Sequence, residues 1–163
     1  MGYSVRESIS ILEDIRKSGE IQSKKVHEAG SNLVKTHSFS NSNEACVIFE
    51  QVAIASMEVG DLDSAKLCIE KLVAEFPDSL RINRLECMLC EAKGDYSAAL
   101  EGYENILALD PGNLLVYKRK IAILIAQKKY TAAIKALVSH LDSFPSDTES
   151  WIKLSQLYSS ENM

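Results

Sequence analysis

Four cysteines and three histidines are the residues that could carry metal or redox chemistry in this chain of 163 residues. Only Cys87 and Cys90 are close in sequence, as a C-x-x-C pair. A zinc site needs a second Cys or His pair at ligand spacing, and a thioredoxin-like site needs a surrounding βαβ pattern. Neither accompanies this pair. We therefore interpret both residues as small apolar side chains packed between helices, and expect no metal and no cofactor.

The remaining candidate residues do not form a catalytic constellation. The histidines, His27, His37 and His140, are far apart in sequence and none lies in an H-E-x-x-H motif. The chain contains no G-x-S-x-G motif, no P-loop and no Rossmann glycine pattern. We interpret His140 as a helix-packing residue, and Asp61 and Asp63 as favourable charges at a helix start. The sequence therefore predicts that the protein is not an enzyme.

The composition narrows the class of protein further. Hydrophobic residues make up 46% of the chain and charged residues 25%, which suits a packed domain. The formal net charge of −5 argues against general binding of nucleic acid, which needs an excess of Lys and Arg. The longest wholly apolar run, residues 121–126, is far shorter than the ~20 residues that span a bilayer. We expect a cytoplasmic protein that reaches a membrane only through partners.

The three prolines reveal the elements that position these residues. Pro77, Pro111 and Pro145 follow one another at intervals of 34 residues, which is the period of the tetratricopeptide repeat (TPR). Before each proline stands an Ala where two helices must approach closely, at positions 65, 99 and 133, followed by further helix-packing positions four and seven residues on. Gly60 and Gly94 can adopt the positive φ that ends a helix, and proline ends each second helix.

We therefore predict an all-α fold, a right-handed TPR superhelix built from helix-turn-helix repeats. The repeats span 46–79, 80–113 and 114–147, with the first helix of a truncated fourth repeat at 148–163. First helices are expected near 44–58, 80–93, 114–127 and 148–159, and second helices near 62–76, 96–109 and 130–143. Expected N-caps are Asn113 and either Ser146 or Asp147. Because a half-repeat leaves an apolar face partly uncovered, we expect the chain to be the N-terminal part of a longer protein.

Residues 1–45 lie outside the repeat and are predicted to form an N-terminal helical cap. Ser4 and Glu7 have the spacing of a capping box, followed by a weak apolar stripe. A second helix is expected near 20–37, with one apolar side formed by Val26, Ala29, Leu33 and Val34. The polar stretch 38–43 has the composition of a linker.

The first helices of TPR units line a concave groove, mainly through the second, fifth, ninth and twelfth places of each repeat. The candidate partner-binding residues in this groove are Glu50, Ile54, Arg81, Arg84, Met88, Lys118, Arg119, Ala122 and Ile125. Three of them, Arg81, Arg84 and Lys118, form a cationic middle with Arg119 near its rim. This pattern favours a site for an acidic, partly apolar peptide or partner helix. The alternative is a solvated charged face without a partner.

Several segments resemble the family of subunit 2 of the endoplasmic reticulum (ER) membrane protein complex. They are residues 49–60, Arg84-Leu85, Glu91-Ala92, Lys118-Arg-Lys-Ile-Ala-Ile123 with Ala126-Gln127, and the stretch from Trp151 to Tyr158. The resemblance implies a non-enzymatic scaffold at the cytosolic face of the ER, which holds other subunits of a complex that inserts transmembrane segments. The chain departs from the family in its first 20 residues and in Lys128-Lys129, which replace the usual turn glycine.

Two other functions compete with this one. The first is a generic co-chaperone or adaptor. TPR domains that clamp the C-terminal carboxylate of heat-shock chaperones have Lys, Asn and Arg at five groove places, and only Arg119 agrees with that pattern. The chain could also be the TPR arm of a larger enzyme such as an O-linked N-acetylglucosamine transferase. Such arms carry Asn ladders at the ninth places, which here are Ile54, Met88, Ala122 and Gln156.

Overall fold

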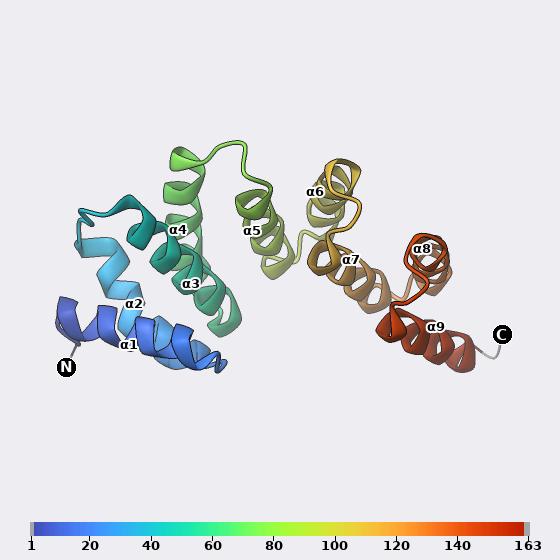
Figure 1. The fold of residues 1–163 in the computed structure, drawn as a ribbon, viewed down its shortest axis with the longest axis horizontal. Helices are drawn as coiled ribbons and strands as arrows, with labels where there is room; N and C mark the ends of the chain where they lie inside the picture. Colours follow the sequence, from blue (N-terminus) through green and yellow to red (C-terminus); the bar gives the residue numbers. More distant parts are fainter. Residues whose placement is uncertain (1, 162–163) are drawn as a thin grey trace. The chain divides into compact units, whose positions relative to one another are not determined.

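The computed structural model describes residues 2–161, and this part of the chain contains helices and connecting turns but no strand (Figure 1). The helices are α1 (Val5–Ser18), α2 (Ser23–Thr36), α3 (Ser42–Val59), α4 (Leu62–Glu75), α5 (Leu80–Ala92), α6 (Tyr96–Leu109), α7 (Leu114–Ala126), α8 (Tyr130–Ser143) and α9 (Thr148–Ser160). The predicted all-α class is confirmed. Their positions agree with the predicted pairs of first and second helices, whereas the exact repeat frames and the superhelical sense stay predictions.

The chain divides into two compact units, one ending at Gly102 and the other beginning at Tyr103. In the first unit, consecutive helices from α1 to α5 pack against one another, and α3 also touches α5 (Figure 1). In the second unit, α8 packs against both α7 and α9. Stacked helix pairs of this kind bury a continuous apolar interior because each helix presents one apolar face to its neighbours.

Small residues lie at buried helix contacts. Ala65, Ala99 and Ala133 are all fully buried, as the repeat alignment predicts. Gly30 of α2 lies so near α3 that an added Cβ would be 2.3 Å from Val52 Cγ2. The predicted apolar side of α2 is likewise buried, so α1 and α2 pack on α3 in the manner of a further helix pair.

The helix starts follow the predicted capping chemistry. Ser4 and Glu7 form a complete capping box at α1, and the Asp61 side chain accepts a hydrogen bond from Ser64 N at α4. Asn113 caps α7, and of the two candidates for α9 the cap is Asp147. The predicted linker 38–43 is too long at its C-terminal end, because α3 already begins at Ser42. The Asn41 side chain caps this helix by accepting hydrogen bonds from the amides of residues 43 and 44.

The turns between first and second helices share one backbone conformation. Gly60 and Gly94 have φ of 88° and 81°, in the left-handed region, and Lys128 has φ of 57° at the equivalent turn. A lysine here keeps the turn hydrogen bonds from Lys128 N to the Ile125 carbonyl (2.9 Å) and from Lys129 N to the Leu124 carbonyl (2.8 Å). It does so at a conformational cost that glycine does not have.

Replacing Lys128 with glycine should therefore raise the free energy of unfolding by about 1 kcal/mol, because the strain of a side chain at positive φ is removed. Urea unfolding of the chain followed by circular dichroism measures this difference. The matched control is Lys129→Gly, where φ is −85° and glycine relieves no strain of positive φ. A Lys128→Gly variant no more stable than the original chain would contradict the assignment of strain to this turn.

Enlarging Ala133 to leucine should destabilise the second unit by about 1–3 kcal/mol, because this side chain is 0% exposed in the packed interior. Thermal and urea unfolding of the variant test the expectation. Ala132→Leu serves as the control, since Ala132 is the preceding residue of α8 and is exposed. Equal stability of the two variants would show that Ala133 does not occupy a tight helix contact.

Candidate functional site

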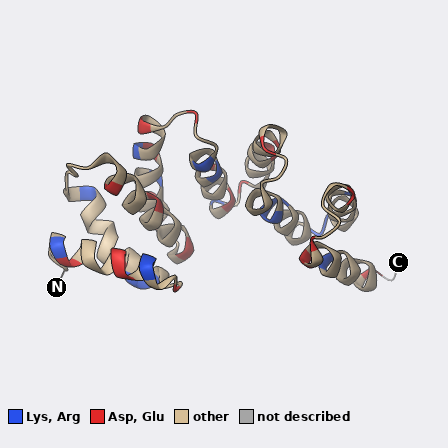
Figure 2. Ribbon diagram, in the orientation of Figure 1, with Lys and Arg blue, Asp and Glu red and all other residues tan. Residues whose placement is uncertain are grey.

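The candidate groove residues of the first unit lie on α3 and α5, where they form an ion-pair cluster. The Glu50 carboxylate receives both Nη2 (2.7 Å) and Nε (3.0 Å) of Arg81, and Nη2 of Arg84 lies 3.6 Å from it. Two-point contact of this kind is the strong arrangement for Arg and a carboxylate. The predicted cationic character of Arg81 and Arg84 is thus partly neutralised by Glu50, which comes from the preceding first helix. Figure 2 shows acidic positions along α3 and basic positions on α5.

These three side chains differ in how far a partner could reach them. The Arg81 side chain is 70% exposed, whereas those of Arg84 and Glu50 are 18% and 14% exposed. Ile54 of α3 is half-buried, and Met88 of α5 is buried. Of the candidate residues in this unit, Arg81 is therefore the one most available to a partner, and Met88 belongs to the interior.

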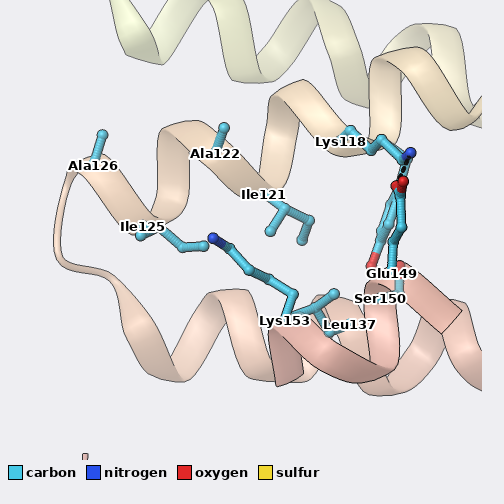
Figure 3. A pocket seen from close by; sticks show the side chains of 10 residues that line it. Lys118, Ile121, Ala122, Ile125, Ala126, Leu137, Glu149, Ser150 and Lys153 are labelled. Atoms are coloured by element: carbon cyan, nitrogen blue, oxygen red, sulfur yellow. Dashed lines mark hydrogen bonds and ion pairs between the residues drawn. The ribbon is translucent and has the colours of Figure 1, made fainter. Parts of the chain in front are cut away.

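The candidate residues of the second unit surround a pocket of about 540 Å³ between α7 and α9 (Figure 3). Lys118, Ala122 and Ile125 all line it, together with Tyr117, Ile121, Ala126, Leu137, Glu149, Ser150 and Lys153. The lining combines aliphatic side chains of α7 and α8 with polar and charged side chains at the start of α9. Arg119 is half-buried and does not line this pocket.

One end of the pocket carries an ion pair between Lys118 Nζ of α7 and the Glu149 carboxylate of α9 (Figure 3). Charged residues of this rim are exposed, so their mutual attraction is screened by solvent and salt. The next lysine of α7, Lys120, pairs instead with Glu104 of α6 at 3.3 Å. Lys118 and Lys120 of α7 therefore pair with different acidic residues.

The same spacing underlies the ion pairs in both units. Glu50 and Arg81 are 31 residues apart, and so are Lys118 and Glu149, with the charges reversed. Each pair joins the fifth place of one first helix to the second place of the next. The repeat pattern marks these places as groove positions but does not specify that they pair. A search of the sequence for opposite charges 31 residues apart would have found both Glu50–Arg81 and Lys118–Glu149.

Of the C-x-x-C pair, only Cys87 is fully packed between helices. Cys87 is buried, and an added Cβ at Gly102 of α6 would lie 2.3 Å from its Sγ. Burial raises the pKa of the Cys87 thiol to about 11 and that of Cys68 to about 12, so both remain protonated thiols near neutral pH. Cys90 is half-buried. The interpretation of Cys87 as a packing residue is confirmed.

Comparison with known proteins decides the family. The model of a family described as the EMC2 TPR-like repeat domain matches residues 69–163, more than half of the chain. The chain belongs to this family. The resemblance inferred from the sequence is thereby confirmed.

Three similar proteins come from three different organisms. The chain is 38% identical over 146 residues to ER membrane protein complex subunit 2-A of Xenopus laevis, covering 90% of the chain and 49% of that protein. It is 32% identical over 157 residues to the subunit 2 of Dictyostelium discoideum, covering 94% of the chain and 48% of that protein. TPR repeat protein oca3 of Schizosaccharomyces pombe is 33% identical over 111 residues, or 68% of the chain and 39% of the protein.

The chain thus spans about half the length of the two subunit 2 relatives it matches. Within residues 2–161, no helix combines the length and the apolar character that crossing a membrane requires. In the same range, no group of three or more His, Cys, Asp or Glu side chains is placed to hold a metal ion.

In this member of the family, His140 forms a packed hydrogen-bonded cluster at the junction of α8 and α9. Its ring stacks on Tyr117 with centroids 3.8 Å apart, and its Nε2 lies 3.0 Å from Asp147 Oδ2. The same carboxylate oxygen accepts the Ser150 hydroxyl at 2.7 Å while the other caps α9. The interpretation of His140 as a helix-packing residue is confirmed.

A related contact occurs in the first unit, where His27 Nε2 of α2 lies 2.8 Å from Asp61 Oδ2, and Asp61 caps α4. Hydrogen bonds from Ser64, followed by that from His27, hold the pKa of the Asp61 carboxyl far below its ordinary value. Both histidines are therefore tied to the capping carboxylate of another helix. The repeat pattern does not specify these His–Asp contacts.

The Asp147 carboxylate should make the free energy of unfolding of the chain fall at acidic pH. Its pKa is lowered chiefly by the Ser150 hydrogen bond and further by His140. A lowered folded-state pKa stabilises the fold above the unfolded carboxyl pKa of about 3.9, and this contribution disappears as the pH falls through the folded value. Asp147→Asn, which retains a good N-cap, should therefore lose less stability than the original chain between about pH 6 and about pH 3.

Urea unfolding at both pH values measures this effect. Asp142→Asn is the control, because Asp142 is an exposed residue of α8. Parallel loss of stability in the original chain and in Asp147→Asn would contradict a role for the Asp147 charge.

Proposed function

We propose that this chain is a non-catalytic TPR scaffold that binds other protein subunits, as the subunit 2 of an ER membrane protein complex. Membership of the EMC2 TPR-like repeat family carries this proposal. The relatives in Xenopus laevis and Dictyostelium discoideum bear that subunit's name. On this proposal the chain lies at the cytosolic face of the ER, is held there by its partners, and supports a complex that inserts transmembrane segments.

The helix pairs support a scaffold role because they bury one face of each helix and leave another face to solvent. Leu114 and Leu115 at the start of α7 are exposed large apolar residues, as is Val47 on α3. Exposed apolar side chains beside charged ones are typical of surfaces that bind other proteins. The first helices therefore supply both apolar contact area and charges for docking.

The proposed docking surface consists of the candidate groove residues other than the buried Met88, considered separately in each unit. In the first unit, Arg81 is the exposed cation, and Glu50 orients it through two hydrogen bonds. In the second unit, Lys118 and Glu149 present both charges at the end of an apolar pocket. A partner that brings both carboxylates and cations can exchange the intramolecular ion pairs for intermolecular ones at little net electrostatic cost.

The relatives described above are named as subunits of the ER complex or as a TPR protein, and so give no support to a co-chaperone or to the arm of a glycosyltransferase. A scaffold needs no catalytic group, and its chemistry is that of complementary surfaces. We propose no cofactor, metal or nucleic acid as a ligand.

A pull-down from detergent-solubilised ER membranes tests this function with the tagged full chain as bait. Integral ER subunits should be recovered, and mass spectrometry identifies them. The double variant Arg81→Gln and Lys118→Gln should recover less of them, because it removes the two exposed cations of the docking surface. Recovery of soluble chaperones alone would overturn the proposal.

The matched control removes two exposed lysines outside this surface, Lys25 of α2 and Lys135 of α8, with the same change in net charge. We choose Arg81 in place of Arg84 because the Arg84 side chain is largely buried against Glu50. Circular dichroism of both double variants establishes that the fold is intact.

A further inference from the structure

The pocket between α7 and α9 has an apolar interior. Ile121 and Ile125 of α7 and Leu137 of α8 provide its aliphatic surface, and Ala122 and Ala126 leave space beside them (Figure 3). Its volume of about 540 Å³ falls within the ~300–1,000 Å³ typical of pockets that bury ligands. The two alanines matter because a larger residue at either position would occupy part of this space.

The charges around the pocket leave one cation without a counter-ion. Lys118 and Glu149 satisfy each other at one end, whereas the Lys153 side chain extends from α9 across the apolar surface toward Ile125 (Figure 3). Within residues 2–161, the Lys153 ammonium forms no ion pair with a carboxylate. Asp147, the other nearby acid of α9, is bonded to His140 and Ser150.

Tyr117 adds a polar group to the pocket wall. Its side chain is 6% exposed, and its hydroxyl lies beside that of Ser150. The Ser150 hydroxyl donates to Asp147. The pocket thus combines aliphatic surface with the exposed Lys153 ammonium, which has no carboxylate partner in the described residues. This combination is complementary to an apolar group next to a carboxylate.

We propose that this pocket binds an acidic-apolar segment of a protein partner. One apolar side chain of the segment enters the pocket and packs against Ile121, Ile125 and Leu137, and a neighbouring carboxylate pairs with Lys153. The proposal rests on the proposed scaffold function and adds to it a defined subsite and the residue Lys153. The exposed Lys118–Glu149 pair favours a peptide over a simple fatty acid, because a peptide offers both N–H and C=O groups to it.

Lys153 lies at the sixth place of the truncated fourth repeat, the place that Arg119 holds in the preceding repeat, and it was not among the predicted groove residues. Its position over the pocket depends on how α9 packs against α8, with Leu154 and Leu157 buried. Burial of these leucines fixes the rotation of α9 about its axis. That rotation directs Lys153 to the α7 side.

Methyl NMR of the full chain, with isoleucine δ1 methyl groups labelled, tests the proposal. The probe is acetyl-Asp-Leu-Phe-Glu-amide, and acetyl-Lys-Leu-Phe-Lys-amide has the same apolar residues with opposite charge. The acidic peptide should shift the methyl signals of Ile121 and Ile125 saturably and leave Ile69 of the first unit unchanged. Lys153→Glu should weaken its binding at least about tenfold, and added salt should weaken binding to the original chain.

Lys135→Glu is the matched control, because it reverses an exposed charge of α8 away from the pocket lining. It should bind the acidic peptide as the original chain does. Equal affinity of Lys153→Glu, equal binding of the basic peptide, or tighter binding of decanoate than of the acidic peptide would each overturn the proposal. So would shifts confined to residues outside the pocket.

The pull-down described above separates this inference from the scaffold function. If the acidic peptide fails to bind but the chain still recovers integral ER subunits, the pocket assignment is wrong and the scaffold function stands. If the peptide binds at Lys153 but no ER subunit is recovered, the pocket stands and the proposed complex is wrong.

Discussion

Close approach of helices at small residues is the constraint on which this structure depends. Ala65, Ala99 and Ala133 are fully buried at the same place of successive repeats, and Gly30 has the same role where α2 meets α3. A helix pair cannot bury its apolar face unless the backbones come close enough for their side chains to interdigitate. The small residues permit this contact, and the larger aliphatic residues around them provide most of the buried apolar area. Each pair then presents a new apolar face to the next helix.

Once the apolar faces are buried, polar residues determine what the exposed faces can do. The ion pairs Glu50–Arg81 and Lys118–Glu149 connect successive first helices within a unit at the same spacing, with opposite polarity. Exposed pairs of this kind add at most about 1 kcal/mol to stability, so their main consequence is to hold long side chains in position. The surface is therefore less cationic than its Arg and Lys residues alone suggest. It presents ordered charges beside apolar groups, which is a suitable arrangement for selective docking of protein partners.

The histidines illustrate how chemistry-bearing residues are used for architecture. His27 and His140 each contact an aspartate that caps another helix, and His140 is further enclosed by Tyr117 and Phe144. Such contacts join the start of one helix to the body of another, so helix capping and helix packing depend on each other. Cys87 and Cys68 are likewise buried, and their raised pKa values follow from loss of solvation. In both cases reactive side chains stabilise the interior.

The amino-acid sequence by itself determined the helices, their pairing and the family. The proline period, the buried alanines and the capping residues are local signals, because helix starts, ends and apolar faces depend on residues a few positions apart. Tertiary structure alone decided which charges pair, how far Met88 and Arg84 are buried, and that Lys153 extends over a pocket with Tyr117 at its wall. These features depend on the rotation and approach of helices about 30 residues apart in sequence, which a repeat pattern does not specify. A residue's place in the repeat predicts its face, and only packing determines its neighbours.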